Sequence, residues 1–174
     1  ARLSEALINN GELEKAEKVL DLAMEKMPVK YFEYYSLLEP YIIGYYELNR
    51  PEKARKVYEE VSRIYQEHLL YYSGFKFERQ RRIADDIITD MERYRSLVRY
   101  VAMYDDEEFA RAEAKKFNDY LKLFRHFYSP DEALDIDKEL ISNPDIDMPI
   151  DSSLLEQMNL ERSQKIDMEA PLHP

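Results

Sequence analysis

The chain has 174 residues, of which 45% are hydrophobic and 35% charged, and this composition excludes wholesale disorder. Its formal net charge of −11 argues against non-specific binding to nucleic acid or to an anionic membrane surface, since both attract basic proteins. The absence of cysteine excludes disulfides, zinc–thiolate sites and thiol nucleophiles. No stretch of about 18 uncharged apolar residues occurs, so we expect no transmembrane span.

Charged and aromatic residues divide the chain into two parts. Residues 1–128 carry 24 acidic and 22 basic side chains and all 22 aromatic ones, whereas residues 129–174 carry 12 acidic and 3 basic. A segment without aromatic side chains buries little apolar surface and so offsets little ordering entropy. We therefore predict a helical domain over residues 1–128. Residues 129–174 should form a mostly irregular acidic tail with one or two short helices.

Apolar residues recur at helical spacing throughout the first part, and strand signals are nearly absent. In chain order, the predicted helices cover residues 1–9, 12–27, 31–48, 51–72, 76–104 and 105–128. Gly11, Pro28 and Gly74 end helices, and Pro51 suits the first turn of the fourth. Pro40 should either kink the third helix or mark where its regular part begins.

A short segment of the sequence occurs twice. The pattern Glu-Lys-Ala-x-Lys-Val-[Leu/Tyr] stands at 14–20 and again at 52–58, so Ala16 and Ala54 are 38 residues apart. A repeat at such a period is typical of stacked helical units. A small residue where two helices cross lets them approach closely, and a bulky residue one turn later fills the facing groove.

The first unit resembles the tetratricopeptide repeat (TPR). Ala16, Leu20, Ala23 and Pro28 occupy the family's small, bulky, small and proline positions, whereas the second unit has Gln66 in place of the proline. The resemblance implies an all-α fold, a TPR-like right-handed array of about three antiparallel helix pairs. These pairs would span residues 1–27, 31–72 and 76–128.

A second resemblance rests on residues 13–28, the Tyr-rich helix at 31–46 and the long helix after Tyr72. Together they are similar to the soluble C-terminal region of a family of large bacterial multi-pass membrane proteins. The membrane domain of that family is similar to lipid-linked-sugar protein O-mannosyltransferases. The resemblance implies a soluble fragment whose parent lies in the bacterial inner membrane, with this domain on the periplasmic side. Sequence that reads as mid-helix directly after Ala1 favours a piece of a longer protein, although removal of an initiator Met would also produce Ala1.

The ionisable residues form no pattern typical of a catalytic or metal site. His68, His126 and His173 are widely separated, and no His-Glu-x-x-His pair occurs. The Asp-Ile-Asp motifs at 135–137 and 145–147 lack the glycine turn of a calcium loop. We therefore expect no catalytic residues, no metal and no cofactor in this chain, and no enzyme activity.

The sequence has one basic cluster, made of Lys76, Arg79, Arg81 and Arg82. One interpretation is contact with phosphates or lipid headgroups. The interpretation that we favour pairs Arg81 with Asp85 and Arg82 with Asp86 at i,i+4 on a solvated helix face.

In TPR-like arrays the first helix of each pair lines the concave groove that holds the partner. Carried over by register, the resemblance gives five candidate groove residues, Glu39, Ile43, Tyr46, Arg95 and Arg99. Tyrosine in such a groove suits contact with peptides and, by ring stacking, with sugars. Four other tyrosines are expected in the core, Tyr34, Tyr41, Tyr45 and Tyr58.

These patterns predict a non-catalytic protein–protein interaction or scaffolding module. Its partner would be a protein or peptide, or the membrane domain of the same chain, and no nucleic acid. The alternative is an accessory domain that holds an acceptor protein or a glycan for a membrane glycosyltransferase.

Overall fold

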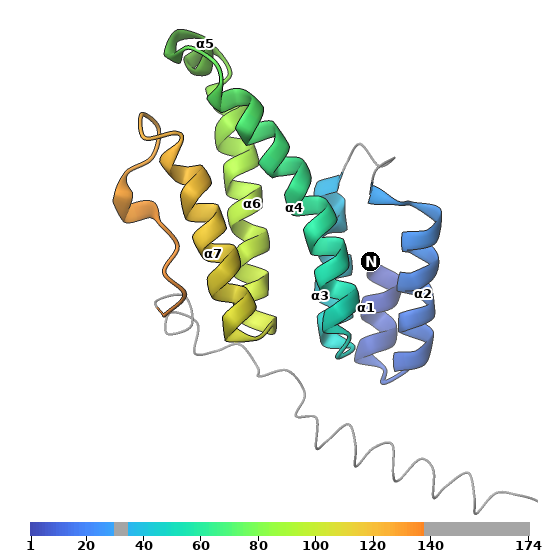
Figure 1. Cartoon of the computed structure of the whole chain (residues 1–174). Coiled ribbons are helices and arrows are strands. Elements are labelled where there is room, and N and C mark those ends of the chain that lie inside the picture. Colours follow the sequence, from blue (N-terminus) through green and yellow to red (C-terminus); the bar gives the residue numbers. More distant parts are fainter. Residues whose placement is uncertain (30–34, 138–174) are drawn as a thin grey trace, which may run out of the picture. The chain divides into compact units, whose positions relative to one another are not determined.

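Figure 1 shows the computed structural model, which describes residues 1–29 and 35–137. Within these ranges the regular elements are all helices and no strand occurs, as the predicted all-α class requires. The α-helices are α1 (Arg2–Asn9), α2 (Leu13–Lys26), α3 (Glu39–Glu47), α4 (Pro51–Ser73), α5 (Phe77–Arg82), α6 (Ala84–Tyr104) and α7 (Glu107–Lys122). No helix of the described ranges combines the length and apolar character needed to cross a bilayer. The chain divides after Pro144, and its second unit lies wholly outside the described residues.

Local sequence signals set most of the helix ends. Gly11 has a φ of +74°, a left-handed conformation that allows the sharp turn between α1 and α2. Pro51 is the first residue of α4, and the Asp106 carboxylate accepts a 2.8 Å hydrogen bond from the Phe109 amide at the start of α7. The predicted helices at 1–9, 12–27 and 51–72 are therefore confirmed to within one residue at each end.

The third predicted helix is regular only in its second part. A 3-10 helix, η2 (Tyr35–Leu38), precedes α3, and Pro40 lies in the first turn of α3, where its missing N–H costs no hydrogen bond. Of the two alternatives for Pro40, the start of the regular helix is the one observed. Residues 30–34, with Tyr34, lie outside the described residues.

The prediction of one helix over 76–104 is wrong, because the chain breaks at Ile83 between α5 and α6. Ile83 has φ −114° and ψ 25°, outside helical geometry. Gln80 of α5 is buried, and its amide Nε2 donates to the carbonyls of Tyr72 at 3.1 Å and Ser73 at 3.4 Å. These two hydrogen bonds hold α5 against the end of α4, and α5 does not continue into α6.

The sixth predicted helix is shorter than expected. The helix α7 ends at Lys122, and turns follow through Phe127 in place of the helix predicted to reach Tyr128. Phe124 and Tyr128 are nevertheless buried, because the turns fold both side chains back onto the core. Burial of these rings outweighs continuation of the helical pattern.

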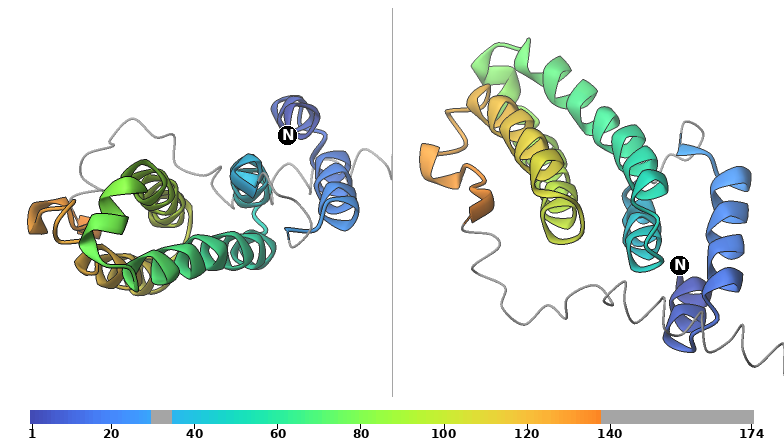
Figure 2. Two further views of the ribbon diagram at one scale, coloured as in Figure 1. Left: turned by 90° about the horizontal axis from the view of Figure 1, so that it is seen from above. Right: turned by 60° about the horizontal axis from the view of Figure 1, so that its bottom comes forward.

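The core lies between helices that are close together in the chain. Contacts join α1 to α2, α3 to α4, α4 to α6 and α6 to α7, and Figure 2 gives two further views of these helices. Ala16 and Ala54 of the repeated segment are fully buried, as are Leu20 and Tyr58 one turn later. A Cβ on Gly44 would lie 3.2 Å from Cδ1 of Leu20, so glycine permits the close approach of α2 and α3.

Residues 129–137 pack against α7 rather than forming a separate tail. A 3-10 helix, η3 (Pro130–Glu132), begins this segment. The Asn118 side chain accepts from the Leu134 amide at 2.8 Å and donates to its carbonyl at 2.9 Å. Leu134 and Ile136 are buried. Residues 129–137 thus pack on the helical domain, and residues 138–174 of the predicted tail lie outside the described residues.

Candidate partner-binding site

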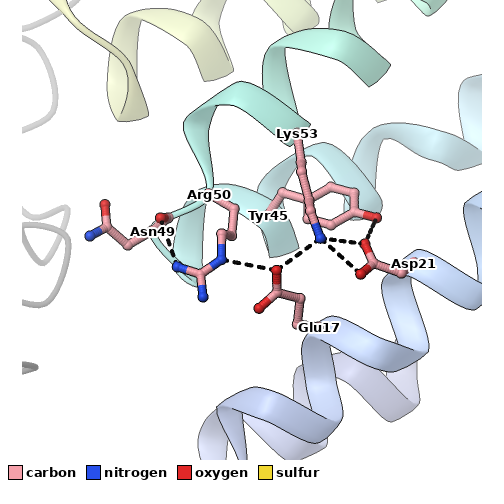
Figure 3. A network of polar contacts seen from close by, with 6 residues as sticks. All are labelled: Glu17, Asp21, Tyr45, Asn49, Arg50 and Lys53. Carbon is pink, nitrogen blue, oxygen red and sulfur yellow. Dashed lines mark hydrogen bonds and ion pairs between the residues drawn. The ribbon is translucent and has the colours of Figure 1, made fainter. Parts of the chain in front are cut away.

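A polar network fixes α2 against α3 and α4 (Figure 3). Oε1 of Glu17 accepts from Arg50 Nε at 2.9 Å and from Lys53 Nζ at 2.8 Å. Lys53 also donates to Asp21 at 2.8 Å, and the Tyr45 hydroxyl donates to Asp21 at 3.0 Å. The hydrogen bonds from Arg50 and Lys53 lower the pKa of Glu17 to about 2. The network therefore orients the first helices of the chain and with them the candidate groove residues on α3.

Tyr46 is part of the core rather than of an exposed surface. It is 5% exposed, its hydroxyl donates to Asp105 Oδ2 at 2.6 Å, and its ring stacks on Tyr104 with centroids 5.6 Å apart. Burial and the hydrogen bond to Asp105 raise the pKa of Tyr46. The ring was expected to face an open groove. It is buried instead, because α6 packs over the end of α3 that carries Tyr46.

Of the two arginines in the candidate set, Arg95 packs toward α7. The Arg95 side chain is 13% exposed, and its Cζ lies 5.4 Å from the ring centre of Phe117 on α7. Its nearest acid is Glu92, with 3.7 Å between Nη2 and Oε1. Arg99 is exposed on α6. Tyr104 of α6 does reach α3, because its ring stacks on that of Tyr46, and the register carried over from the repeat family did not predict this contact.

Glu39 and Ile43 are half-buried on α3, and Ile43 lines a pocket between α1 and α3. The pocket has a volume of about 200 Å³. Its lining consists of Ala1, Ser4, Glu5, Ile8, Pro40, Ile43, Gly44 and Glu47. Apolar side chains from both helices thus share this surface with two carboxylates, one from each helix.

Two carboxylates line this pocket, Glu5 from α1 and Glu47 from α3. Burial raises the pKa of Glu47, and the negative charge of Glu5 raises it further. Neither Glu5 nor Glu47 forms an ion pair within the part of the chain that the structure describes. Burial also raises the pKa of Glu39, against the opposing charge of Arg93. A cation brought to the α1–α3 pocket would relieve this repulsion.

A second polar cluster joins η2, α4 and α6, and sequence reasoning did not find it. His68 Nδ1 lies 2.9 Å from Asp90 Oδ2 and 3.4 Å from the Tyr35 hydroxyl. The Tyr72 hydroxyl donates to the same Asp90 oxygen at 3.5 Å. Burial, followed by the Asp90 charge, raises the pKa of Tyr72 to about 12. Only the i,i+4 spacing of His68 and Tyr72 is visible in the sequence, because the other partners come from separate elements.

Nothing in either cluster forms a metal centre. Among the described residues, no three His, Asp or Glu side chains gather closely enough to hold a metal ion. Comparison of the chain with known protein families, with curated proteins and with solved structures found no match. The class of protein therefore rests on geometry alone: the described residues form helices without strands, and a partly apolar pocket with two carboxylates lies between α1 and α3.

Proposed function

We propose that the helical unit is a non-catalytic interaction module that binds a protein or peptide partner on the surface formed by α1 and α3. The observation that carries this proposal is the pocket between these helices, in which Ile8 and Ile43 lie beside Glu5 and Glu47. A small pocket that combines apolar and charged groups suits the anchoring side chain of a partner better than a whole metabolite.

The chemistry of the pocket favours a basic anchor. A lysine or arginine can lay its aliphatic stem on apolar side chains while its charged head meets carboxylates. A cation that lies between Glu5 and Glu47 attracts both carboxylates and so offsets the repulsion between them. The partner segment should therefore carry a basic residue next to apolar ones.

The finer features of the proposal rest on resemblance. A TPR-like arrangement of antiparallel helix pairs would make α1 and α3 neighbouring first helices, the position at which that family holds its partners. The buried repeat positions Ala16 and Ala54 support this arrangement. We further propose that the module is the extramembrane, periplasmic part of a larger bacterial membrane protein, so its partner includes the membrane domain of the same chain.

Selection of random peptides displayed on phage tests the proposed function. Enriched peptides should contain Lys or Arg beside an apolar residue. Glu47→Gln should weaken their binding about fivefold, the effect of about 1 kcal/mol for a partly exposed ion pair. The control is Glu14→Gln on α2, an exposed carboxylate remote from the pocket, which should leave affinity unchanged. Peptides that bind equally well to both variants would contradict the proposal.

A second candidate function is the handling of a glycan or acceptor protein for a glycosyltransferase. The cluster of Tyr35, His68, Tyr72 and Asp90 favours it, because half-buried rings beside a carboxylate provide the stacking and hydrogen bonding that sugars use. A glycan array probed with the chain should then give specific binding that Tyr72→Ala abolishes. Binding of peptides alone would exclude this candidate.

A further inference from the structure

Exposed apolar side chains gather where α4 ends and α5 begins. Leu70 is 61% exposed, Tyr71 63% and Phe77 45%. The Phe77 ring lies 4.7 Å from that of His126, so the turn after α7 meets α5 here, and it brings Leu123, which is 45% exposed. We call residues 70–82 and 123–127 the aromatic–basic end of the array. Large apolar side chains exposed together mark a contact surface more often than single ones do.

Cations are interleaved with these apolar side chains. Residues 70–82 carry four cations and one acid, a net charge of +3 in a chain of net −11. The Arg79 guanidinium lies 3.8 Å from the ring centre of Phe75, a cation–π contact that keeps ring and charge together. Lys76, Arg81 and Arg82 are exposed.

The ion pairs that the sequence favoured for these arginines are not formed. No ion pair joins Arg81 to Asp85 or Arg82 to Asp86 among the described residues. The break at Ile83 removes the continuous helix that i,i+4 pairing requires. The predicted pairing with these acids is therefore not observed, whereas the predicted solvated position of Arg81 and Arg82 is, since both side chains are exposed. The cations of α5 are thus available to an external anion.

The orientation of α5 is fixed rather than incidental. Gln80 is its one buried residue, and the bonds from Gln80 to the Tyr72 and Ser73 carbonyls hold the helix across the end of α4. With Gln80 inward, Arg79, Arg81 and Arg82 remain exposed. The fold thus presents rings and cations together on one anchored element.

We propose that the aromatic–basic end docks on the surface of an anionic lipid bilayer. Tyrosine prefers the headgroup region, where its ring is in apolar surroundings and its hydroxyl meets water, and exposed Phe and Leu side chains bury their apolar surface at the boundary with the acyl chains. Lysine and arginine beside them are attracted to anionic headgroups. This surface lies on α4, α5 and the turn after α7, so it goes beyond the peptide pocket on α1 and α3. The net charge of −11 for the whole chain does not reveal the local charge of +3 over residues 70–82.

Vesicle co-sedimentation of the full chain tests the proposal. The chain should bind vesicles of phosphatidylcholine with about one third phosphatidylglycerol, bind pure phosphatidylcholine much less, and lose binding as salt rises. Arg79→Ala/Arg81→Ala/Arg82→Ala should weaken binding on the order of 100-fold, since each cation contributes about fivefold. A Tyr71→Ser/Phe77→Ser variant keeps the charge and should also weaken binding.

A matched control is Lys18→Ala/Lys56→Ala/Lys115→Ala, which removes three exposed cations outside this end and should bind like the parent chain. Circular dichroism and the melting temperature establish that every variant is folded. Equal binding of the two triple variants, or equal binding to both vesicle types, would overturn the proposal. So would binding to soluble polyglutamate without binding to vesicles, which would instead indicate an acidic protein partner.

Discussion

At the scale of the residue, Tyr46 shows how one side chain joins three elements. Its ring stacks on Tyr104 of α6, and its hydroxyl donates to Asp105 at the turn before α7. Arg55 of α4 binds the same carboxylate, with 2.8 Å from Nε to Oδ2. Burial alone would raise the pKa of the Asp105 carboxyl. The hydrogen bonds from Arg55 and Tyr46 lower that pKa by more, so it lies below its usual value. The Asp106 backbone amide also donates to this carboxylate, at 2.8 Å, so the Tyr46 hydroxyl is one of several donors that hold a charged acceptor and has a structural role.

Substitution of Tyr46 separates the hydroxyl from the ring. Tyr46→Phe should lower the free energy of unfolding by about 1.5 kcal/mol, the value of a hydrogen bond to a charged group. Tyr46→Ala should lower it by about 3–5 kcal/mol, because it also leaves a cavity. Urea denaturation at pH 7 measures both. Tyr71→Phe, at a position 63% exposed, is the control and should change little. Equal stability of the two Phe variants would contradict the structural role.

The residue scale also marks the limit of prediction from sequence. Burial of Ala16, Ala54 and Tyr58 follows from the repeat, because a small residue at a helix crossing has a simple geometric cause. The positions of Tyr46 and Arg95 do not follow. They depend on the rotation of α6 about its axis, and a turn of about 100° per residue moves a side chain from one neighbour to another.

At the scale of the element, the contact of α2 with α4 depends on charges as well as on packing. Glu17 and Asp21 stand one turn apart on α2, and Arg50 and Lys53 meet them from the start of α4 (Figure 3). Lys53 lies within the second copy of the repeated segment and Glu17 within the first. The repeat therefore predicts that both segments are helical. It does not predict that Lys53 of the second copy forms an ion pair with Glu17 of the first.

This network gives a pH dependence with a defined sign. The folded-state pKa of Glu17 is about 2, below its usual 4.5, so its contribution is present above pH 4.5 and is lost as the pH falls toward 2. Because these groups are partly exposed, Glu17→Gln should destabilise the fold by about 1 kcal/mol at pH 7. Denaturation at several pH values should show this difference shrinking below pH 4.5. Glu14→Gln on the same helix serves as control. If the stability difference between Glu17→Gln and the parent chain does not change with pH, the lowered pKa of Glu17 is contradicted.

The boundaries of elements were predictable where the cause is local. Gly11, Pro51 and Asp106 act on their own backbone, and the helices that they bound were expected. The break at Ile83 was not, because its cause is the bond of Gln80 to carbonyls seven and eight residues earlier in a different helix. Helical periodicity continues through residues 76–104, so the sequence carries no mark of this tertiary contact.

At the scale of the whole molecule, charge and apolar surface are unevenly distributed. The pocket between α1 and α3 is acidic, whereas the aromatic–basic end carries a local excess of cations. A single net charge of −11 therefore describes neither surface. Composition predicted the fold class, but the two proposed contact surfaces depend on how separate helices bring their side chains together.

The extent of the helical unit provides the last prediction. Residues 129–137 bury Leu134 and Ile136, and Asn118 binds the Leu134 backbone through two hydrogen bonds. Burial of two aliphatic side chains, reduced by the entropy of ordering the segment, should contribute about 2 kcal/mol. A chain that ends at Asp137 should therefore unfold at a higher urea concentration than one that ends at Tyr128. Asn118→Ala in the longer chain should remove part of this difference and have little effect in the shorter one. Equal midpoints for the two chains would instead support a domain that ends at residue 128.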